Sequence, residues 1–79
     1  MSDNKNIKVY SKHNCSQCKE VKSYLNYNNI PYEEFNIEED SAAYEYVINS
    51  GYRMMPVVEF KDGTTMSGFD RLTLMQKTR

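Results

Sequence analysis

The pattern of apolar and polar positions predicts a β-strand and then a helix in the first third of the chain. Residues 7–11 (Ile-Lys-Val-Tyr-Ser) alternate between apolar and polar side chains, which is typical of a strand. After a short polar connection, Cys18, Val21 and Leu25 recur at the spacing of one helix face. This helix is expected to end shortly before Pro31, because the residue that precedes a proline avoids the α region.

The next segment repeats this order with a second strand and a second helix. Residues 32–37 show a mixed pattern that suits the edge of a sheet better than its centre. Asp40 or Ser41 is expected to cap the following helix, and Gly51 to supply the left-handed residue that ends it. The predicted apolar face of this helix consists of Ala43, Tyr44, Val47 and Ile48.

The last part of the chain predicts a hairpin and a short helix. Residues 56–60 (Pro-Val-Val-Glu-Phe) are typical of a strand, residues 62–63 (Asp-Gly) of a two-residue turn, and residues 64–67 supply an antiparallel return strand. Gly68 breaks the pattern, and a helix with Asp70 in its first turn is expected to follow. The predicted apolar positions of this helix are Phe69, Leu72 and Met75.

The predicted element order is β-α-β-α-β-β-α, and a chain of 79 residues provides material for one domain, residues 1–79. Parallel strands need a crossover connection, which the helices supply, whereas the hairpin strands are antiparallel. We therefore expect an α/β protein with a four-stranded mixed sheet flanked by helices. This is the minimal thioredoxin-like architecture.

Charge and composition indicate which partners and which cellular compartment to expect. Ten basic and eleven acidic side chains give a formal net charge of −1 without any basic block, so a nucleic acid partner is not expected. The first residues are polar rather than signal-like, and no apolar run approaches the about 20 residues that span a bilayer. We therefore expect a cytoplasmic protein without a membrane partner.

The two cysteines, Cys15 and Cys18, enclose Ser-Gln at the start of the first predicted helix. A helix start carries partial positive charge and free backbone N–H groups, which favour the reactive thiolate. Structural disulfides are rare in the cytoplasm, so the pair is expected to cycle between disulfide and dithiol. Helical spacing predicts that Cys18 points inward and that Cys15 is exposed at the helix tip.

Three blocks of sequence carry a family resemblance. Residues 9–18 (VYSKHNCSQC), residues 51–59 (GYRMMPVVE) and residues 67–69 (SGF) stand in this order. They resemble the V-Y-T-K-x-x-C-x-Q-C, G-[FY]-x-x-x-P-V-V-E and S-G-F blocks of glutaredoxins, most closely of the NrdH-redoxins. The resemblance runs nearly end to end, and the three blocks together are far more specific than a lone C-x-x-C.

The resemblance implies a thiol–disulfide oxidoreductase that acts as a small electron carrier with a glutaredoxin-type fold, and a monomer is the default expectation for so small a carrier. Cys15 would attack a substrate disulfide as a thiolate, and Cys18 would resolve the mixed disulfide. The implied acceptor is ribonucleotide reductase or another disulfide protein, and the implied electron donor is thioredoxin reductase. No bound cofactor is implied beyond the redox-active Cys15–Cys18 disulfide.

The resemblance also implies a surface for partners around the cysteines. The Met55-Pro56 peptide bond would be cis and would face the pair, with the Met55 backbone pairing with an extended substrate segment. Gly68 would let a partner backbone approach, and Phe69 would offer an apolar contact. From the residues alone, Pro56 equally suits the start of a strand, and Gly68 and Phe69 equally suit a tight turn and the core.

Two further candidates lie beside the cysteines. Lys12 is expected to steer anionic groups and to favour the thiolate, with a solvated loop lysine as the alternative. Gln17 is expected to stabilise the neighbouring loop or to contact the reductase, with an exposed helix glutamine as the alternative.

The chain departs from the NrdH-redoxin pattern at two places, and these leave the electron donor open. Met66 stands where the family usually has Trp before S-G-F, and residues 70–71 (Asp-Arg) replace its Arg-Pro. Asp70 resembles the aspartate of the G-G-x-D segment with which glutathione-using glutaredoxins hold glutathione, so glutathione is the alternative reductant. Residues 16–17 (Ser-Gln), in place of the Pro-Tyr common in those glutaredoxins, argue against it.

Two rival classes remain beside the redox carriers. His13, Cys15 and Cys18 are close enough in sequence to suggest a zinc module, but structural zinc sites need four ligands, and the chain has no further Cys or His. A pure interaction domain that has lost redox activity is the other rival, and the intact cysteine pair argues against it.

Overall fold

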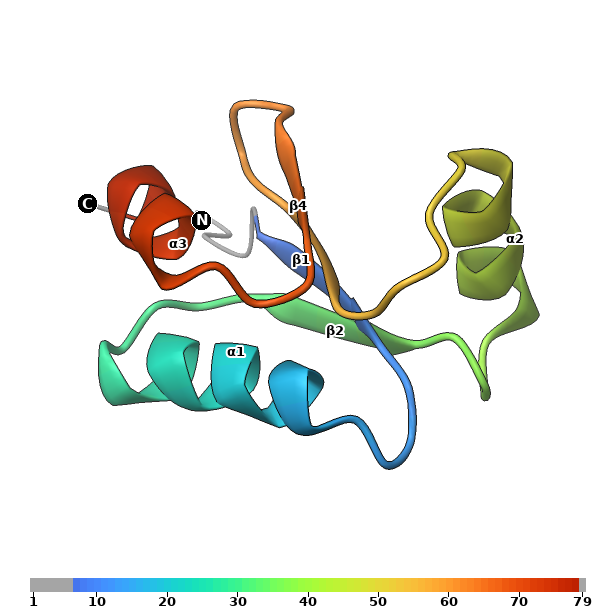
Figure 1. The fold of residues 1–79 in the computed structure, drawn as a ribbon, viewed down its shortest axis with the longest axis horizontal. Helices are drawn as coiled ribbons and strands as arrows, with labels where there is room; N and C mark the ends of the chain where they lie inside the picture. Colours follow the sequence, from blue (N-terminus) through green and yellow to red (C-terminus); the bar gives the residue numbers. More distant parts are fainter. Residues whose placement is uncertain (1–6, 79) are drawn as a thin grey trace, which may run out of the picture.

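The computed structural model describes residues 7–78, which form a four-stranded sheet flanked by three helices (Figure 1). The elements are β1 (Lys8–Ser11), α1 (Ser16–Tyr27), β2 (Glu33–Asn36), α2 (Ser41–Asn49), β3 (Val57–Glu59), β4 (Thr65–Ser67) and α3 (Arg71–Lys77).

The strand order in the sheet is β2-β1-β3-β4. Strand β1 pairs parallel with β2 and antiparallel with β3, and β3 pairs antiparallel with β4. The predicted mixed sheet is therefore confirmed, and so is the predicted edge position of β2. Strands β1, β3 and β4 each begin one residue later than predicted, at Lys8, Val57 and Thr65.

The sheet separates two apolar layers, because successive residues of a strand point to opposite faces. Val9 and Val58 face the layer that contains α1 and α3. Tyr10 and Val57, their neighbours in sequence, face the layer that contains α2 and the two cysteines. Figure 1 shows α2 standing apart from the other two helices, in agreement with this division.

Helix α1 forms as the sequence predicts. Cys18, Val21 and Leu25 are buried at 1%, 0% and 0% exposure, which confirms the predicted inner face. The helix ends at Tyr27 with Asn28 as its C-cap, and Asn29 adopts the left-handed region at φ 57°, two residues before the proline.

The predicted apolar face of α2 is only half correct. Asp40 caps the helix by accepting hydrogen bonds from the backbone N–H groups of residues 42 and 43, and Ala43 and Val47 are buried. Tyr44 and Ile48 are 49% and 46% exposed. Helix α2 has only nine residues and contacts the sheet through a single row of side chains. Two of the four predicted positions therefore lie outside this contact.

The prediction for α3 is wrong at two positions. Leu74 is fully buried, whereas Leu72 and Met75 are 70% and 43% exposed. Phe69 precedes the helix and packs against the core of the α1 layer, and Asp70 is the N-cap rather than a residue of the first turn. A helix of seven residues has room for one central anchor, and the side chain that lies over the sheet is Leu74.

The hairpin between β3 and β4 turns as expected at Gly63, which has φ 90°. Asp62 accepts hydrogen bonds from the hydroxyl and backbone N–H of Thr64, and it pairs with Lys77 at 2.9 Å, which ties the turn to α3. The Thr64 hydroxyl contributes most to lowering the pKa of Asp62 below its ordinary value. None of the helices within residues 7–78 is long and apolar enough to cross a membrane.

Candidate active site

The centre of the site is a disulfide between Cys15 and Cys18, whose Cα atoms lie 5.2 Å apart. Cys15 is the N-cap of α1, with extended backbone angles, and the backbone N–H of Cys18 donates to the Cys15 sulfur at 3.1 Å. The sulfur therefore occupies the place where a capping side chain meets the positive end of a helix. When the disulfide is reduced, this N–H donor and the helix start favour a thiolate on Cys15.

The prediction that Cys15 is exposed at the helix tip is wrong for the oxidised protein. Cys15 is 8% exposed and Cys18 is 1% exposed. The bond to Cys18 draws the Cys15 sulfur over the first turn of α1, where it joins the apolar cluster that includes Met55. The predicted inward position of Cys18 is confirmed.

The Met55-Pro56 peptide bond is cis, as the resemblance implied. The Cys15 sulfur lies 3.8 Å from the carbonyl oxygen of Met55, so this peptide bond faces the disulfide. Met55 and Pro56 are themselves buried, whereas Met54, one residue earlier, is 60% exposed. The segment thus presents its backbone to the disulfide and one apolar side chain to the outside.

A second segment, residues 67–69, is hydrogen-bonded to the first. The Ser67 hydroxyl donates to the carbonyl oxygen of Met54 at 3.2 Å, and the backbone N–H of Gly68 donates to that of Pro56 at 2.7 Å. Gly68 has φ 82°, a left-handed value that favours glycine. The two segments therefore form one connected rim beside the cysteines.

Gln17 joins this rim to α1. Its side-chain oxygen accepts a hydrogen bond from the backbone N–H of Phe69 at 2.9 Å. A β-carbon on Gly68 would lie 3.2 Å from the same oxygen, a tight contact that would push the end of the Gln17 side chain by a few tenths of an ångström. Of the two predicted roles of Gln17, stabilising the neighbouring loop is the one that this contact supports.

The other two candidates have different surroundings. Asp70 caps α3: one carboxylate oxygen accepts from the backbone N–H of Thr73 at 3.4 Å, and the other from its hydroxyl at 3.0 Å. Lys12 is exposed in the loop before α1, and its amine makes no hydrogen bond or ion pair within residues 7–78. A role of Lys12 toward the thiolate stays a prediction.

The surroundings of His13 do not match those of a zinc ligand. Its ring nitrogen lies 3.1 Å from a carboxylate oxygen of Glu39, and its backbone N–H donates to Glu38 at 2.9 Å. The two cysteine sulfurs are bonded to each other. No group of three His, Cys, Asp or Glu side chains between residues 7 and 78 is placed to hold a metal ion.

Several contacts that hold the site together escaped the sequence analysis. The hydroxyls of Tyr52 and Thr65 share a hydrogen bond that fixes the segment after α2 to β4, and Ser67 holds Met54 in the same way. Each of these pairs is separated by 13 residues, so no local pattern indicates it.

Comparisons with known proteins agree with this geometry. A family model described as Glutaredoxin matches residues 7–64. The glutaredoxin-like protein NrdH of Lactococcus lactis subsp. lactis (strain IL1403) is 46% identical over 63 residues, which cover 80% of this chain and 86% of that protein. N-acetyl-S-hydroxy-L-cysteine reductase of Bacillus subtilis (strain 168) is 37% identical over 73 residues, which cover 91% of this chain and 78% of that protein.

Among solved structures, the glutaredoxin-like protein NrdH-redoxin from Escherichia coli matches with a TM-score of 0.82 and 27% identity, covering 89% of this chain and 91% of that chain. The predicted thioredoxin-like fold is thereby confirmed. With the Glutaredoxin family model matching most of its length and an NrdH relative of 46% identity, the chain belongs to the glutaredoxin family of thiol–disulfide oxidoreductases.

Proposed function

We propose that this protein is an NrdH-type electron carrier that reduces protein disulfides, with ribonucleotide reductase as its main acceptor and thioredoxin reductase as its electron donor. One observation carries the proposal: the Cys15–Cys18 disulfide lies at the start of α1 and faces the backbone of Met55 at 3.8 Å. The 46% identity to an NrdH protein supports the choice of acceptor.

The reaction transfers two electrons in two exchange steps. The Cys15 thiolate attacks one sulfur of the substrate disulfide, which breaks that bond, forms a mixed disulfide and releases the other substrate sulfur as a thiolate. Cys18 loses its proton and attacks the Cys15 sulfur, which forms the 15–18 disulfide and releases the second substrate thiolate. Thioredoxin reductase then supplies two electrons that restore the dithiol.

The rim beside the cysteines supports docking of a protein rather than of a small molecule alone. An extended substrate segment would pair with the backbone of residues 54–55, as one strand edge pairs with another. Met54 and Phe69 would contact its side chains, and the absence of a β-carbon at Gly68 would let its backbone come close. Lys12 would attract anionic groups of the partner.

Two contacts argue against glutathione as the reductant. The backbone N–H of Phe69 is already bonded to Gln17, and both carboxylate oxygens of Asp70 are already bonded to Thr73. A glutathione molecule held by this segment would have to break some of these bonds. The NrdH-redoxin of Escherichia coli is described as having a thioredoxin-like activity profile, which favours the same choice.

A coupled assay tests the choice of donor. The protein is supplied with insulin as a probe disulfide and with either NADPH and thioredoxin reductase, or NADPH, glutathione and glutathione reductase. We expect NADPH oxidation in the first system and only background oxidation in the second. The reverse result would establish a glutathione-dependent glutaredoxin instead.

A second series with the same donor tests the acceptor. Oxidised ribonucleotide reductase is expected to be reduced faster than insulin. N-acetyl-S-hydroxy-L-cysteine belongs in this series, because a relative that is 37% identical is named as its reductase. Faster turnover of that small sulfenic acid than of either protein would overturn the proposed acceptor but not the proposed donor.

The proposal includes a single domain over residues 1–79, a monomeric state and a cytoplasmic location. The proposed location rests on the proposed chemistry, because disulfides of cytoplasmic proteins are usually transient and catalytic. Size-exclusion chromatography with light scattering, on oxidised and reduced protein, tests the monomer.

A further inference from the structure

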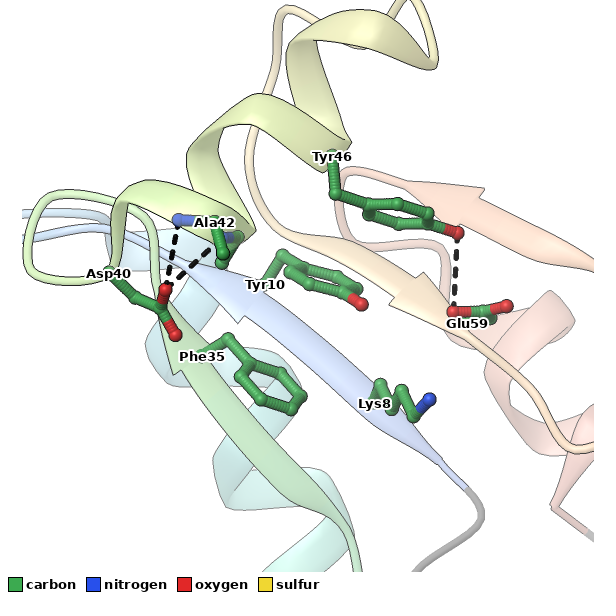
Figure 2. A pocket seen from close by; sticks show the side chains of 8 residues that line it. Lys8, Tyr10, Phe35, Asp40, Ala42, Tyr46 and Glu59 are labelled. Atoms are coloured by element: carbon green, nitrogen blue, oxygen red, sulfur yellow. Dashed lines mark hydrogen bonds between the residues drawn. The ribbon is translucent and has the colours of Figure 1, made fainter.

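A pocket of about 380 Å³ opens on the α2 side of the sheet, and none of its lining residues belongs to the redox site (Figure 2). Strands β1, β2 and β3 form its floor, and α2 forms one wall. Its main lining side chains are Lys8, Tyr10, Phe35, Asp40, Tyr46 and Glu59.

The inner wall is aromatic. The ring of Tyr10 stacks on Phe35 with a centroid distance of 5.2 Å and an interplanar angle of 20°. On its other side it contacts Tyr46, also at 5.2 Å, with an angle of 30°. Tyr46 is 42% exposed, so its ring extends the aromatic surface outward from the buried Tyr10. Such surfaces attract planar cations through the ring quadrupole.

The Tyr10 hydroxyl is an unused polar group in this pocket. Tyr10 is 7% exposed, and its hydroxyl, which lies at the accessible edge of the ring, has no hydrogen-bond partner within residues 7–78. Figure 2 shows the hydroxyl pointing toward the side of the pocket where Lys8 and Glu59 lie. Burial, aided by the charge of Glu59, raises the pKa of Tyr10 to about 12, so the phenol stays neutral and offers an oxygen lone pair to a donor.

The charges around the pocket are mainly negative. Lys8 on β1 stands in register between Glu33 on β2 and Glu59 on β3, and Asp40 lies at the start of α2. Asp40 is occupied by capping, but Glu59 accepts only a long hydrogen bond, 3.4 Å, from the Tyr46 hydroxyl. Two carboxylates and one amine line the pocket, for a net charge of about −1, and Glu33 adds a further negative charge beside Lys8, which together favour a cation.

We propose that this pocket binds the guanidinium group of an arginine side chain presented by a partner protein. The flat guanidinium would stack on the ring of Tyr46 while its N–H groups donate to Glu59 and to the Tyr10 hydroxyl. A compact ammonium group has no plane to stack, and a free guanidinium ion is much smaller than the pocket. The pocket lies on the same side of the sheet as the two cysteines, but its lining residues are not those of the redox site, so the inference does not rest on the proposed redox function.

A titration monitored by NMR tests the proposal on the full chain in its oxidised state. The ligands are the blocked tripeptides Gly-Arg-Gly and Gly-citrulline-Gly, which have nearly the same shape but differ in charge. We expect the arginine peptide to shift the ring resonances of Tyr10, Phe35 and Tyr46 and to bind about threefold or more tighter than the citrulline peptide. Equal affinity of the two peptides, or shifts confined to other residues, would overturn the proposal.

Charge variants locate the binding. Glu59→Gln is expected to weaken the arginine peptide by about threefold, whereas Glu20→Gln, which removes the same charge from α1 in the other layer, leaves affinity unchanged. Tyr46→Phe keeps the aromatic wall and releases Glu59, so affinity should hold or rise. If Glu20→Gln and Glu59→Gln weaken binding equally, the attraction comes from the overall charge and the pocket is not the site.

Guanidinium chloride at the same concentration serves as the free ion. If guanidinium chloride binds as tightly as the arginine tripeptide, this contradicts the proposal that the pocket recognises an arginine side chain of a protein.

Discussion

Gln17 and Phe69 are 52 residues apart in sequence, and a hydrogen bond of 2.9 Å joins the side-chain oxygen of the first to the backbone N–H of the second. Gln17 lies between the two cysteines, and Phe69 lies in the rim that is bonded to the cis-proline segment. The contact therefore links the redox-active turn directly to the surface on which we expect partners to dock. Any shift of residues 67–69 relative to the disulfide must stretch or break it.

Removing this contact should weaken both partner binding and the fold, each by a similar free energy. In Gln17→Ala the N–H of Phe69 loses its partner, which we expect to cost about 1 kcal/mol of unfolding free energy. If the rim then samples several positions, the KM for thioredoxin reductase rises by about fivefold while kcat changes little. Urea denaturation and the coupled assay measure the two effects.

Gln76→Ala is the matched control, because Gln76 is an exposed glutamine on α3. Its KM should equal that of the parent protein. Gln17→Glu keeps an oxygen acceptor at the same place and should restore the protection of the Phe69 amide in hydrogen exchange. A parental KM in Gln17→Ala would show that the contact does not position the rim.

Alanine variants at Gly68 and Gly63 separate the free-energy cost of the backbone conformation from the cost of steric crowding. Both have left-handed φ values, 82° and 90°, so alanine at either position should cost about 1–2 kcal/mol. Only at Gly68 would the new β-carbon meet another atom, the side-chain oxygen of Gln17 at 3.2 Å. We therefore expect Gly68→Ala to lose up to about 1 kcal/mol more than Gly63→Ala, because the end of the Gln17 side chain must shift by a few tenths of an ångström and its hydrogen bond to Phe69 weakens.

The combined variant identifies the source of that extra loss. In a Gln17→Ala background the contact is already gone, so Gly68→Ala and Gly63→Ala should then cost the same, as measured by urea denaturation. If the difference between them persists in this background, the crowding at Gly68 has another origin.

The sequence predicted the fold well because its strongest signals are local. The spacing of Cys18, Val21 and Leu25, the turn at Gly63 and the cap at Asp40 each depend on residues within one or two turns. It failed for Leu72, which is exposed, because the choice between neighbouring apolar residues of a seven-residue helix depends on how that helix crosses the sheet. The angle between α3 and the sheet is set by the residues that pack against the helix, and these lie far away in sequence.

For the site, the cysteine pair and the cis bond before Pro56 came from motifs whose spacing is nearly fixed. The burial of Cys15 was missed because it depends on Met55, 40 residues later, covering the sulfur. The aromatic stack of Tyr10, Phe35 and Tyr46 was missed for the same reason, since its three rings come from two strands and a helix. Residue type indicated chemistry, but only tertiary packing determined its surroundings.

Glu34 should make the stability of the protein depend on pH. It accepts hydrogen bonds of 2.8 Å from Lys22 and from the buried hydroxyl of Ser11, and the Lys22 contact above all lowers the pKa of Glu34 below its ordinary value of 4.5. A carboxyl with a lower pKa in the folded state adds stability above its unfolded-state pKa, and this is lost as the pH falls through the folded-state value. Because the pair is partly exposed and screened, Glu34→Gln should cost at most about 1 kcal/mol at pH 7.

Urea denaturation of this variant between pH 7 and pH 3 measures that difference, which we expect to shrink as the pH falls below 4.5. Glu33→Gln is the control, because its carboxylate makes no hydrogen bond or ion pair within residues 7–78. A difference between Glu34→Gln and the parent that stays constant over this range would mean that the charge of Glu34 contributes nothing.

The two cysteines have different expected roles, attack and resolution, and their serine variants should therefore give opposite results. Cys18 is 1% exposed and its backbone N–H donates to the Cys15 sulfur, so we expect Cys15 to attack and Cys18 to resolve. In Cys18→Ser the first exchange still occurs but the second does not, and a mixed disulfide with insulin or ribonucleotide reductase should accumulate, visible on non-reducing gels and by mass spectrometry. Cys15→Ser should trap no substrate, because its remaining thiol is buried. Full turnover of protein disulfides by Cys18→Ser would rule out the two-cysteine mechanism and leave Cys15 acting alone, with an external thiol as the resolving group.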